Sequence, residues 1–452
     1  MTFHTCSQGC QILSHSLPYY LPNCETITNI FILYVKVNKL MGEKAYGLLD
    51  NLVEVFWTAW NSTCPSLRYG VSTSLLGEAK GVYRNRLHNL PSECLEYDLL
   101  LKKGYLKEKH WVYAIFMAAA ESLPLLYKEC TRKEILQSVL AKVSLGASSK
   151  LLDNLNDEIH TVEEAYNSLE NYLSALRTGE SEKKCSSPVE RAESSACEMA
   201  SWIYQYVDCN VPAFNLYLDD CTKLVEGQIM SLKHKEKRWP SLCEYVGSIA
   251  EKSIGDVWID CDLCQFDLLD EQLITLKKAN EYIFKSSLVY DDVQDIYEDI
   301  RTRSVNSAVL LGCERGTITL DDLVEMECSD VVSLLEESGI LKDVIHLADA
   351  LFLKGVDLLM QVDDPRIDMK ALIRSFRFVR LFNLRKLLMR NKDFWTLKQF
   401  LASFTDFKYV RGQIPLQMFR LANPEFQGMD RNRHRYTGEY ERGRYTYSPL
   451  YS

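Results

Sequence analysis

Two short segments of the chain concentrate acidic residues at spacings that suit an α-helix. Residues 153–158 read Asp-Asn-Leu-Asn-Asp-Glu, and residues 291–299 read Asp-Asp-Val-Gln-Asp-Ile-Tyr-Glu-Asp. A helix turns about 100° per residue, so Asp153 and Asp157 stack on one face, and the acids of the second segment fall within roughly 120° of arc. Like charges at this spacing destabilise a helix, and Mg²⁺ prefers a few carboxylates completed by water and phosphate oxygens. Two such helices facing each other would form a site for a magnesium–diphosphate group.

Each acidic segment also has a simpler interpretation, as a solvated helix face or a helix cap. The residues that flank 291–299 are largely apolar, which predicts a packed helix. Burying an acidic side chain on such a helix costs free energy unless the charge has a partner. The first segment follows Ser148 and Ser149, which offer a rival cap and leave its own acids free for another role. Taken together, the two segments favour metal binding.

The segments that must position these acids read as helices. Only 12 prolines occur in the chain, and none lies between Pro240 and Pro365. Strand-like alternation is scarce, and the glycine at 146 is expected to break the chain shortly before the first acidic segment. Apolar residues recur at three- and four-residue intervals in 44–60, 111–128, 132–143, 189–207, 213–232, 271–302, 319–336, 340–361 and 369–391. We therefore predict an all-α fold, built as a single helical bundle or barrel.

The two ends of the chain differ in character from this helical part. Residues 1–40 are expected to be a poorly ordered N-terminal extension, or to reflect a start placed too far upstream. Residues 41–405 are predicted to form one all-α catalytic domain. Residues 406–452 form a basic, aromatic tail in which arginines alternate with tyrosines. A solvated terminus is the simplest interpretation of the tail, with a lid over a phosphate and weak RNA contact as alternatives.

Composition narrows the function classes. The 452 residues are 47% hydrophobic and 25% charged, which is ordinary for a globular core, and the net charge of −10 argues against nucleic-acid binding. Fifteen scattered cysteines indicate free thiols in the reducing cytoplasm. No apolar run reaches the ~18–20 residues that a transmembrane helix needs, which leaves contact with a membrane surface open, and no signal peptide is recognisable. The sequence gives no oligomeric state.

The two acidic segments resemble the motifs of the class I isoprenoid synthase superfamily, which comprises prenyl diphosphate synthases, squalene and phytoene synthases and class I terpene cyclases. The acids at 291, 292, 295 and 299 resemble a second DDxxD motif, and the same spacing is similar to a cyclase motif that binds metal through its first, fifth and ninth residues. Asp295 to Asp299 also resembles the D-x-x-E-D of squalene synthases. The first segment is similar to the terpene-cyclase acid-rich motif or to D-x-x-x-D-D.

This resemblance implies specific roles. The implied metal ligands are Asp153, Asp157, Glu158, Asp291, Asp292, Asp295 and Asp299. They would hold Mg²⁺ against a linear prenyl diphosphate, and Asp153, Asp157, Asp291 and Asp295 would be central to catalysis by favouring release of diphosphate to an allylic cation. Arg301 and Arg303 are expected to bind the diphosphate, with Arg374, Arg377, Arg380 and Arg385 as an alternative set or a solvated basic face. Gln228 resembles the glutamine of a helical Gly-Gln pair, and Gly227 before it predicts either a close backbone approach or a simple helix contact. Candidate cation-stabilising aromatics are Tyr166, Tyr172, Phe214, Tyr217, Phe284 and Tyr290, although aromatics at helical spacing are usually core residues.

Departures from the family patterns separate the subfamilies. The chain lacks a Gly-Gly-Lys-Arg-x-Arg segment and a Phe-Gln pair before the second motif, and both absences disfavour chain elongation. It also lacks the pyrophosphate-sensing arginine expected in cyclases. A terpene synthase-like enzyme is the leading hypothesis, with a head-to-tail or head-to-head prenyltransferase as the alternative. An all-α metal phosphohydrolase or a helical scaffold is the hypothesis outside this superfamily.

Overall fold

Helices account for the regular secondary structure of this protein, as the sequence predicted. A computed structural model describes residues 61, 63–183, 185–232, 239–391, 393–403 and 407–423, and within these ranges it contains no β-strand. The prediction of an all-α fold is therefore confirmed. The predicted helix 44–60, the N-terminal extension 1–40 and most of the tail lie outside the described residues.

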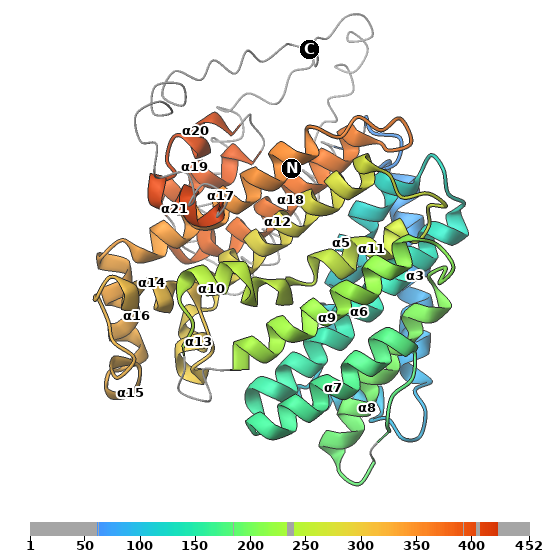
Figure 1. Cartoon of the computed structure of the whole chain (residues 1–452), viewed down its shortest axis with the longest axis horizontal. Helices are drawn as coiled ribbons and strands as arrows, with labels where there is room; N and C mark the ends of the chain where they lie inside the picture. The colour runs from blue at the N-terminus through green and yellow to red at the C-terminus, as the bar shows by residue number, and fades with distance from the viewer. Residues whose placement is uncertain are drawn as a thin grey trace, which may run out of the picture. The chain divides into compact units, whose positions relative to one another are not determined.

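The helices follow one another with short connections (Figure 1). They are α3 (Tyr69–His88), α4 (Tyr97–Lys102), α5 (Glu108–Leu126), α6 (Arg132–Glu158), α7 (Val162–Thr178), α8 (Pro188–Ser201), α9 (Ala213–Ser231), α10 (Leu242–Gly247), α11 (Gly255–Leu263), α12 (Glu271–Gln294), α13 (Ile296–Thr302), α14 (Ser307–Glu314), α15 (Asp322–Glu325), α16 (Cys328–Glu337), α17 (Ile340–Leu359), α18 (Met369–Asn391), α19 (Phe394–Ala402), α20 (Lys408–Arg411) and α21 (Leu416–Ala422). The described residues also include two 3₁₀ helices, η1 (Trp202–Gln205) and η3 (Ile249–Ser253). The described helices thus continue past residue 405, where the sequence predicted the tail to begin.

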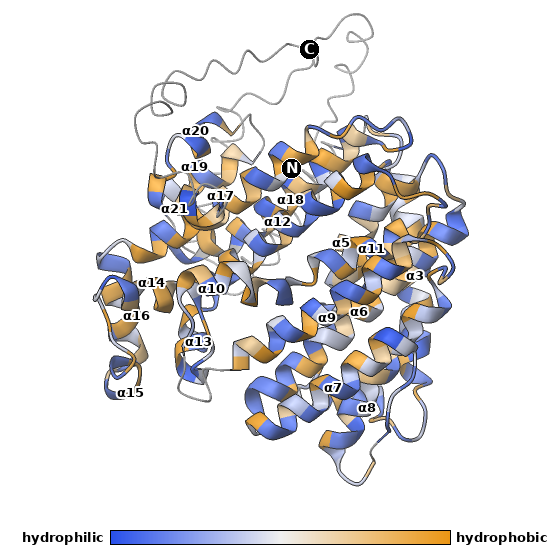
Figure 2. Ribbon diagram, viewed as in Figure 1, coloured by the Kyte–Doolittle hydropathy of each residue, from blue (hydrophilic) through white to orange (hydrophobic). Residues whose placement is uncertain are grey.

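Long helices packed side by side form the centre of the molecule. α12 packs along α17, and α18 packs on both α12 and α5. α5 lies against α6, and α11 contacts α6, α9 and α12 (Figure 1). The helices carry both hydrophobic and hydrophilic residues, and their hydrophobic residues supply a long series of fully buried side chains (Figure 2). This packing places α6 and α12, the helices of the two acidic segments, on either side of α11.

Capping boxes define where several of these helices begin. At the start of α6 the Thr131 backbone N–H donates to Glu134 at 2.6 Å, and the Glu134 N–H donates to the Thr131 hydroxyl. Thr161 and Glu164 repeat the arrangement at α7. A cap of this kind stabilises a helix by about 0.5–2 kcal/mol.

The predicted break at Gly146 does not occur, because α6 continues from Arg132 to Glu158. A Cβ atom at Gly146 would lie 3.2 Å from the ring of Trp258 and 3.5 Å from Ala114. The glycine therefore marks a close contact with α11 and α5. Tertiary packing outweighs the roughly 1 kcal/mol by which glycine disfavours a helix interior.

The arginines of α18 were expected to clamp a phosphate or to form a solvated basic face, and the second expectation is wrong for two of them. Arg380 is fully buried and Arg385 is 7% exposed. The Arg380 guanidinium lies 2.8 Å from Asp349 of α17 and donates at 2.7 Å to the Gln399 carbonyl of α19. The Tyr290 hydroxyl of α12 also donates to Asp349. Arg380 thus joins four helices in the core.

No helix within the described ranges combines the length and the apolarity needed to cross a membrane.

Candidate metal centre

The first acidic segment occupies the last turns of α6. Asp153 and Asp157 are half-buried, and Glu158, the last residue of the helix, is exposed. Lys150 lies one turn earlier on the same helix, and its ammonium pairs with Asp153 at 2.7 Å. Asn154 donates to the Tyr105 carbonyl at 2.9 Å, which ties this end of α6 to the segment before α5.

The second acidic segment does not form one continuous helix, contrary to the sequence prediction. α12 ends at Gln294 and α13 begins at Ile296, with Asp295 between them at φ −101° and ψ 15°. The side-chain amide of Asn306 donates to the Asp292 carbonyl at 2.7 Å, and Arg390 donates to the Val293 carbonyl at 2.5 Å. In an unbroken helix these carbonyls would instead accept the backbone N–H groups four residues later.

The first, fifth and ninth residues of the segment keep their helical relationship despite the break. The Asp295 N–H donates to the Asp291 carbonyl at 2.8 Å, and the Asp299 N–H donates to the Asp295 carbonyl at 3.0 Å. Asp291 and Asp295 are exposed, whereas Asp299 is half-buried. These carboxylates consequently remain on neighbouring turns.

Asp292 differs from its neighbours because it is buried against the start of α14. Its Oδ2 accepts the Ser307 backbone N–H at 3.0 Å, and the side chain is 5% exposed. Asn306 caps the same helix and also donates to Asp299 at 2.7 Å. The sequence analysis missed Asn306, although an Asn–Ser pair before an apolar run is a recognisable helix start. Whether Asp292 binds metal stays a prediction.

Burial raises the pKa of two carboxylates in the second acidic segment, those of Asp292 and Asp299. Burial raises the pKa of Asp292 to about 6, against the lowering effect of its hydrogen bonds to Ser307. Burial, followed by the charge of Asp292, raises the pKa of Asp299 to about 8. A bound cation would favour the charged forms and release protons.

Replacing Asp299 with Asn is expected to stabilise the metal-free protein at high pH. Because the folded pKa is raised, the folded state holds a proton that the unfolded chain loses above its usual pKa near 4, so stability falls as pH rises from about 4 to 8. Asp299→Asn removes this loss, and we expect a gain on the order of 1–3 kcal/mol at pH 8 that disappears below pH 4. Thermal unfolding from pH 4 to 9 measures it, and a difference independent of pH would contradict the assigned cause.

Two lysines interact with carboxylates from both acidic segments. The negative charge of Asp153, then those of Asp157 and Asp291, raise the pKa of Lys150. Burial opposes ionisation of Asp153, but the charges of Lys150 and Lys252 hold its pKa below the usual value. Lys252 of η3 also favours the charged forms of Asp292 and Asp299 in the second segment. The ends of α6 and α12 therefore share one electrostatic environment.

Gln228 of α9 contacts α6 at Ser149, which lies one turn before Asp153. Its side-chain amide donates to the Ser149 hydroxyl at 3.0 Å, and it is 7% exposed. Its Oε1 is buried without a hydrogen-bond partner among the described residues. Contact between Gln228 and a substrate stays a prediction.

Gly227 marks a close backbone approach, one of the two interpretations of the sequence. A Cβ atom there would lie 2.7 Å from the backbone nitrogen of Lys252 and 3.3 Å from Glu251. We expect Gly227→Ala to destabilise the fold by about 1–3 kcal/mol, because η3 must move away from α9. Gly81→Ala in α3 is the matched control, since nothing lies within 4 Å of its Cβ and alanine favours a helix. Urea unfolding of both variants provides the test, and equal stabilisation of the two would contradict it.

The two arginines after the second segment are exposed. Arg301 pairs with Glu298 on α13, and its Nε lies 3.1 Å from that carboxylate. Arg303 ends α13 in the left-handed region, with φ 56°. Diphosphate binding by Arg301 and Arg303 stays a prediction.

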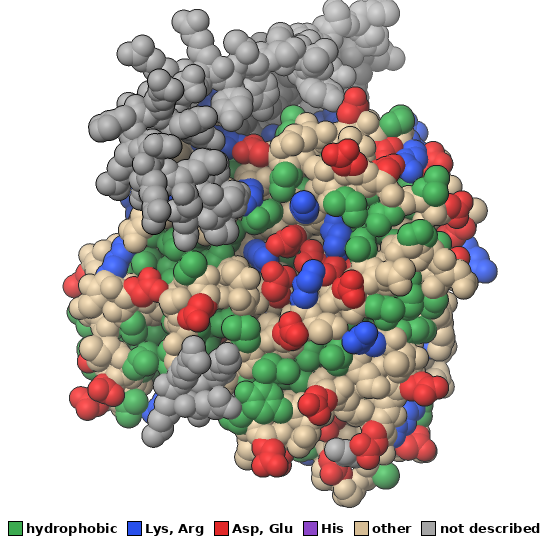
Figure 3. Space-filling view, in the orientation of Figure 1, with side chains coloured by type: hydrophobic (Ala, Val, Ile, Leu, Met, Phe, Trp, Pro, Cys, Tyr) green, Lys and Arg blue, Asp and Glu red, His purple; other side chains and the backbone are tan. Residues whose placement is uncertain are grey.

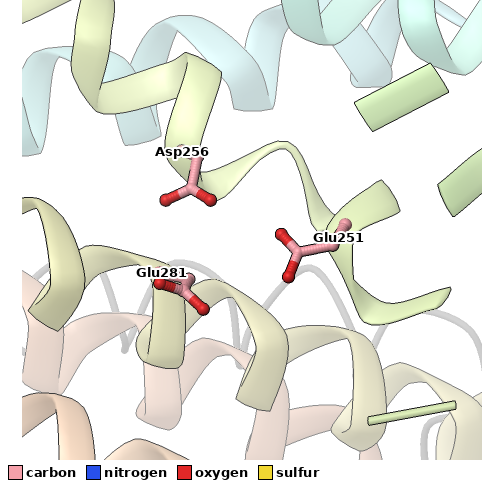
Figure 4. A group of neighbouring side chains, drawn as sticks. All are labelled: Glu251, Asp256 and Glu281. Carbon is pink, nitrogen blue, oxygen red and sulfur yellow. The ribbon is translucent and has the colours of Figure 1, made fainter. Parts of the chain in front are cut away.

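A separate group of carboxylates contains none of the predicted ligands. Glu251, Asp256 and Glu281 bring one oxygen each within 4.8 Å of the others (Figure 4). Lys285 pairs with Glu251 at 2.7 Å and Glu281 at 2.6 Å, and Lys277 lies 3.8 Å from Asp256. Lys285 therefore offsets part of the charge of Glu251 and Glu281, whereas Lys277 pairs more closely with Asp260, at 2.7 Å, than with Asp256. Acidic and basic side chains likewise gather near the centre of the face drawn in Figure 3.

The donor set of the two acidic segments fits a hard divalent cation. All of its candidate ligands are carboxylate oxygens, which Mg²⁺ prefers over nitrogen or sulfur donors. Asp291 and Asp295 are exposed and Asp153 and Asp157 are half-buried, so solvent and a phosphate can reach the same region.

Comparison with known proteins adds structural likeness only. No family model and no curated protein matches the chain. Among solved structures, it is similar to linalool/nerolidol synthase from Streptomyces clavuligerus in complex with 2-fluorogeranyl diphosphate, with 10% identity and a TM-score of 0.41. It is also similar to geranylgeranyl pyrophosphate synthetase from the archaeon Geoglobus acetivorans, with 12% identity and a TM-score of 0.40. Each match covers 68% of this chain and 98% of the other.

Proposed function

We infer that this protein is a Mg²⁺-dependent class I isoprenoid synthase that ionises a linear prenyl diphosphate, and that it acts as a terpene synthase-like enzyme. The observation that carries this proposal is the shared electrostatic environment of the two acidic segments. The charges of Asp153, Asp157 and Asp291 all raise the pKa of Lys150, although more than a hundred residues separate the two segments. Acids of two helix ends whose charges act on the same lysines support a metal–diphosphate site, which needs carboxylates from both segments.

In such a site, acidic residues would bind the metal, and basic residues would bind the diphosphate. Asp153, Asp157, Asp291, Asp295 and Asp299 would hold Mg²⁺, which when bound acts as a Lewis acid toward the leaving diphosphate. Lys150 and Lys252 place ammonium groups among these carboxylates and would bind phosphate oxygens. Arg301 and Arg303 would add bidentate contacts from the exposed side of α13. No side chain has to act as a nucleophile.

Three of the six aromatic residues that the sequence suggested as cation-stabilising are fully buried core residues. Tyr172, Tyr217 and Tyr290 are fully buried, and their hydroxyl groups are hydrogen-bonded in the core. Phe284 of α12 is half-buried and lies two turns below Asp291. Its position supports the proposal, since an aromatic face contributes ~0.5–2 kcal/mol to the stabilisation of a cation above it.

Aromatic rings that the sequence analysis did not select come from α5 and α18. Tyr113 contacts Phe382 edge to face at 5.2 Å between ring centroids, and Phe116 contacts Phe378 at the same distance. Tyr113, Phe116 and Phe382 remain partly exposed. Asn383 donates to Ser287 at 3.0 Å, which places this part of α18 one turn below Asp291. An apolar, aromatic surface beneath the acids suits a hydrocarbon chain.

Turnover assays distinguish this proposal from the alternatives. Purified protein with Mg²⁺ would be incubated with geranyl, farnesyl and geranylgeranyl diphosphate, with and without isopentenyl diphosphate, and extracts analysed by mass spectrometry. A hydrocarbon or terpene alcohol formed without isopentenyl diphosphate is the expected result. Longer diphosphates formed only in its presence would establish a prenyltransferase, and no Mg²⁺-dependent turnover would exclude the proposed activity.

A further inference from the structure

A cleft lies where the C-terminal end of α3, the loop that follows it, α4 and α8 meet. Its volume is about 430 Å³, which is within the range of small-molecule sites in proteins. None of its lining residues belongs to the two acidic segments, so the proposed function gives it no role. Its lining combines apolar with titratable side chains, including His88, Leu90, Glu96, Tyr97, Asp98 and Arg191.

Hydrogen bonds to α8 fix the loop that forms one wall of the cleft. Arg191 donates from Nε to the Cys94 carbonyl at 3.1 Å and from Nη2 to the Ser92 carbonyl at 3.0 Å. The Leu95 backbone N–H contacts the Arg191 carbonyl at 3.0 Å and the Ser195 hydroxyl at 2.9 Å. Because this wall is already held in place, a ligand would not have to order the loop in order to bind.

The charged side chains of the cleft have no ion-pair partners among the described residues. Arg191 bonds only to backbone carbonyls, and its Nη1 makes no hydrogen bond within this part of the chain. The exposed carboxylates of Glu96 and Asp98 likewise form neither an ion pair nor a hydrogen bond there. By contrast, the carboxylate of nearby Glu108 pairs with Arg84 at 2.5 Å. Opposite charges that line one cleft without pairing can both be offset by a single ligand that carries both signs.

Aromatic and aliphatic side chains supply the apolar part of the cleft. The rings of His88 and Tyr97 meet edge to face, with their centroids 5.0 Å apart. The Tyr97 hydroxyl accepts the Trp111 indole N–H at 3.0 Å, which fixes the orientation of the tyrosine ring. Leu87 is fully buried and Leu90 is half-buried. These residues suit an aromatic group of a ligand, because such a group can add a further edge-to-face contact.

We propose that this cleft binds a free α-amino acid with an aromatic side chain. The ligand carboxylate would accept hydrogen bonds from Arg191, and the ligand ammonium would donate to Glu96 and Asp98. Its aromatic ring would pack toward Leu90 and Tyr97. The two acids disfavour a purely anionic ligand such as inorganic phosphate, and the arginine disfavours a simple amine. The inference does not depend on the proposed function, because no residue of the cleft takes part in metal or diphosphate binding.

Isothermal titration calorimetry of the full-length protein with L-phenylalanine tests the cleft. Saturable binding with one site per chain is the expected result. Two analogues divide the charges of the ligand, since phenethylamine lacks the carboxylate and 3-phenylpropionate lacks the ammonium. Each analogue should have a Kd at least about tenfold higher than that of L-phenylalanine, because it loses its hydrogen bonds to a charged side chain.

A double variant, Glu96→Gln with Asp98→Asn, assigns the binding to this cleft. Both side chains are exposed, so the variant is expected to fold, and circular dichroism would verify this. Its Kd for L-phenylalanine should rise at least about tenfold, whereas its Kd for 3-phenylpropionate should stay the same or fall. Glu170→Gln with Glu180→Gln is the matched control, because it removes the same charge from exposed positions outside the cleft and should leave both Kd values within about twofold of wild type.

Three results would overturn the proposal: no saturable binding of L-phenylalanine, equal binding of L-phenylalanine and either analogue, or an unchanged Kd in the folded Glu96→Gln/Asp98→Asn variant. All of these measurements are made without a prenyl diphosphate. The amino-acid site can therefore fail while the isoprenoid synthase activity stands, and the activity can fail while the site stands.

Discussion

Replacing Asp291 and Asp295 together with Asn is expected to reduce Mg²⁺-dependent turnover of prenyl diphosphate by on the order of 10²–10⁴-fold, because a metal ion contributes several kcal/mol of charge stabilisation that neutral amides cannot support. Both side chains are exposed. The free energy of unfolding of the metal-free protein should therefore change by less than about 0.5 kcal/mol, with a small gain where like charges no longer repel. Steady-state kinetics across a Mg²⁺ titration, together with urea unfolding, measures both effects.

A second pair of exposed acids provides the control. Glu325 of α15 and Glu337 of α16 are exposed and lie outside the predicted metal site. The double variant Glu325→Gln with Glu337→Gln removes the same charge from the chain, and its kcat/KM should stay within about twofold of wild type. Equal activity of Asp291→Asn/Asp295→Asn and wild type would contradict the metal role and would support a scaffold.

The largest effect on stability is expected at Arg380. Arg380→Met leaves the Asp349 carboxylate buried without its cation, and both side chains are 0% exposed in the folded protein. Loss of one partner from such a pair destabilises by about 3–5 kcal/mol. Arg380 also holds the Gln399 carbonyl and the Ser403 hydroxyl, so the loss extends to the contact between α18 and α19. Urea unfolding should show a midpoint lowered accordingly or a protein that no longer folds.

An exposed pair of the same chemistry is the matched control for Arg380. Arg411 pairs with Asp357, and their side chains are 44% and 52% exposed. Arg411→Met should cost less than about 1 kcal/mol, since solvent screens an exposed pair. Adding Asp349→Leu to Arg380→Met should recover part of the lost stability, because the uncompensated charge is removed. A cost at Arg380 no larger than that at Arg411 would show that the buried pair has no special role.

Local sequence patterns were sufficient for the fold class and for most helices. Periodic apolar residues and capping boxes depend on neighbours within one or two turns, and such features can be recognised without knowing the tertiary structure. The predicted helix at 319–336 is instead two, α15 and α16, and α6 extends through the glycine expected to end it. Helix limits depend on contacts with distant segments, as the Trp258 ring against Gly146 shows.

The arginines and aromatics show why side-chain roles were harder to predict. The periodicity of α18 places Arg380 on a helix face, but its burial depends on the carboxylate of Asp349 on α17 and on acceptors from Gln399 and Ser403. Tyr172, Tyr217 and Tyr290 looked equivalent to Phe284 by spacing, yet their hydroxyls find partners in the core. The sequence carries the periodicity of each helix but not the identity of the helix packed against it.

The sequence by itself determined that the protein is all-α and that Asp291, Asp295 and Asp299 lie on successive turns, because both follow from helical periodicity. Only the tertiary structure decided that Lys150 and Lys252 interact with both segments and that Asn306 interrupts the second helix at Asp295. It also placed Trp258 of α11 against Gly146 of α6 and Phe284 of α12. The contacts of Lys252 and Trp258 join residues far apart in the chain, because η3 packs on α9 and α12 and α11 packs on α6 and α12.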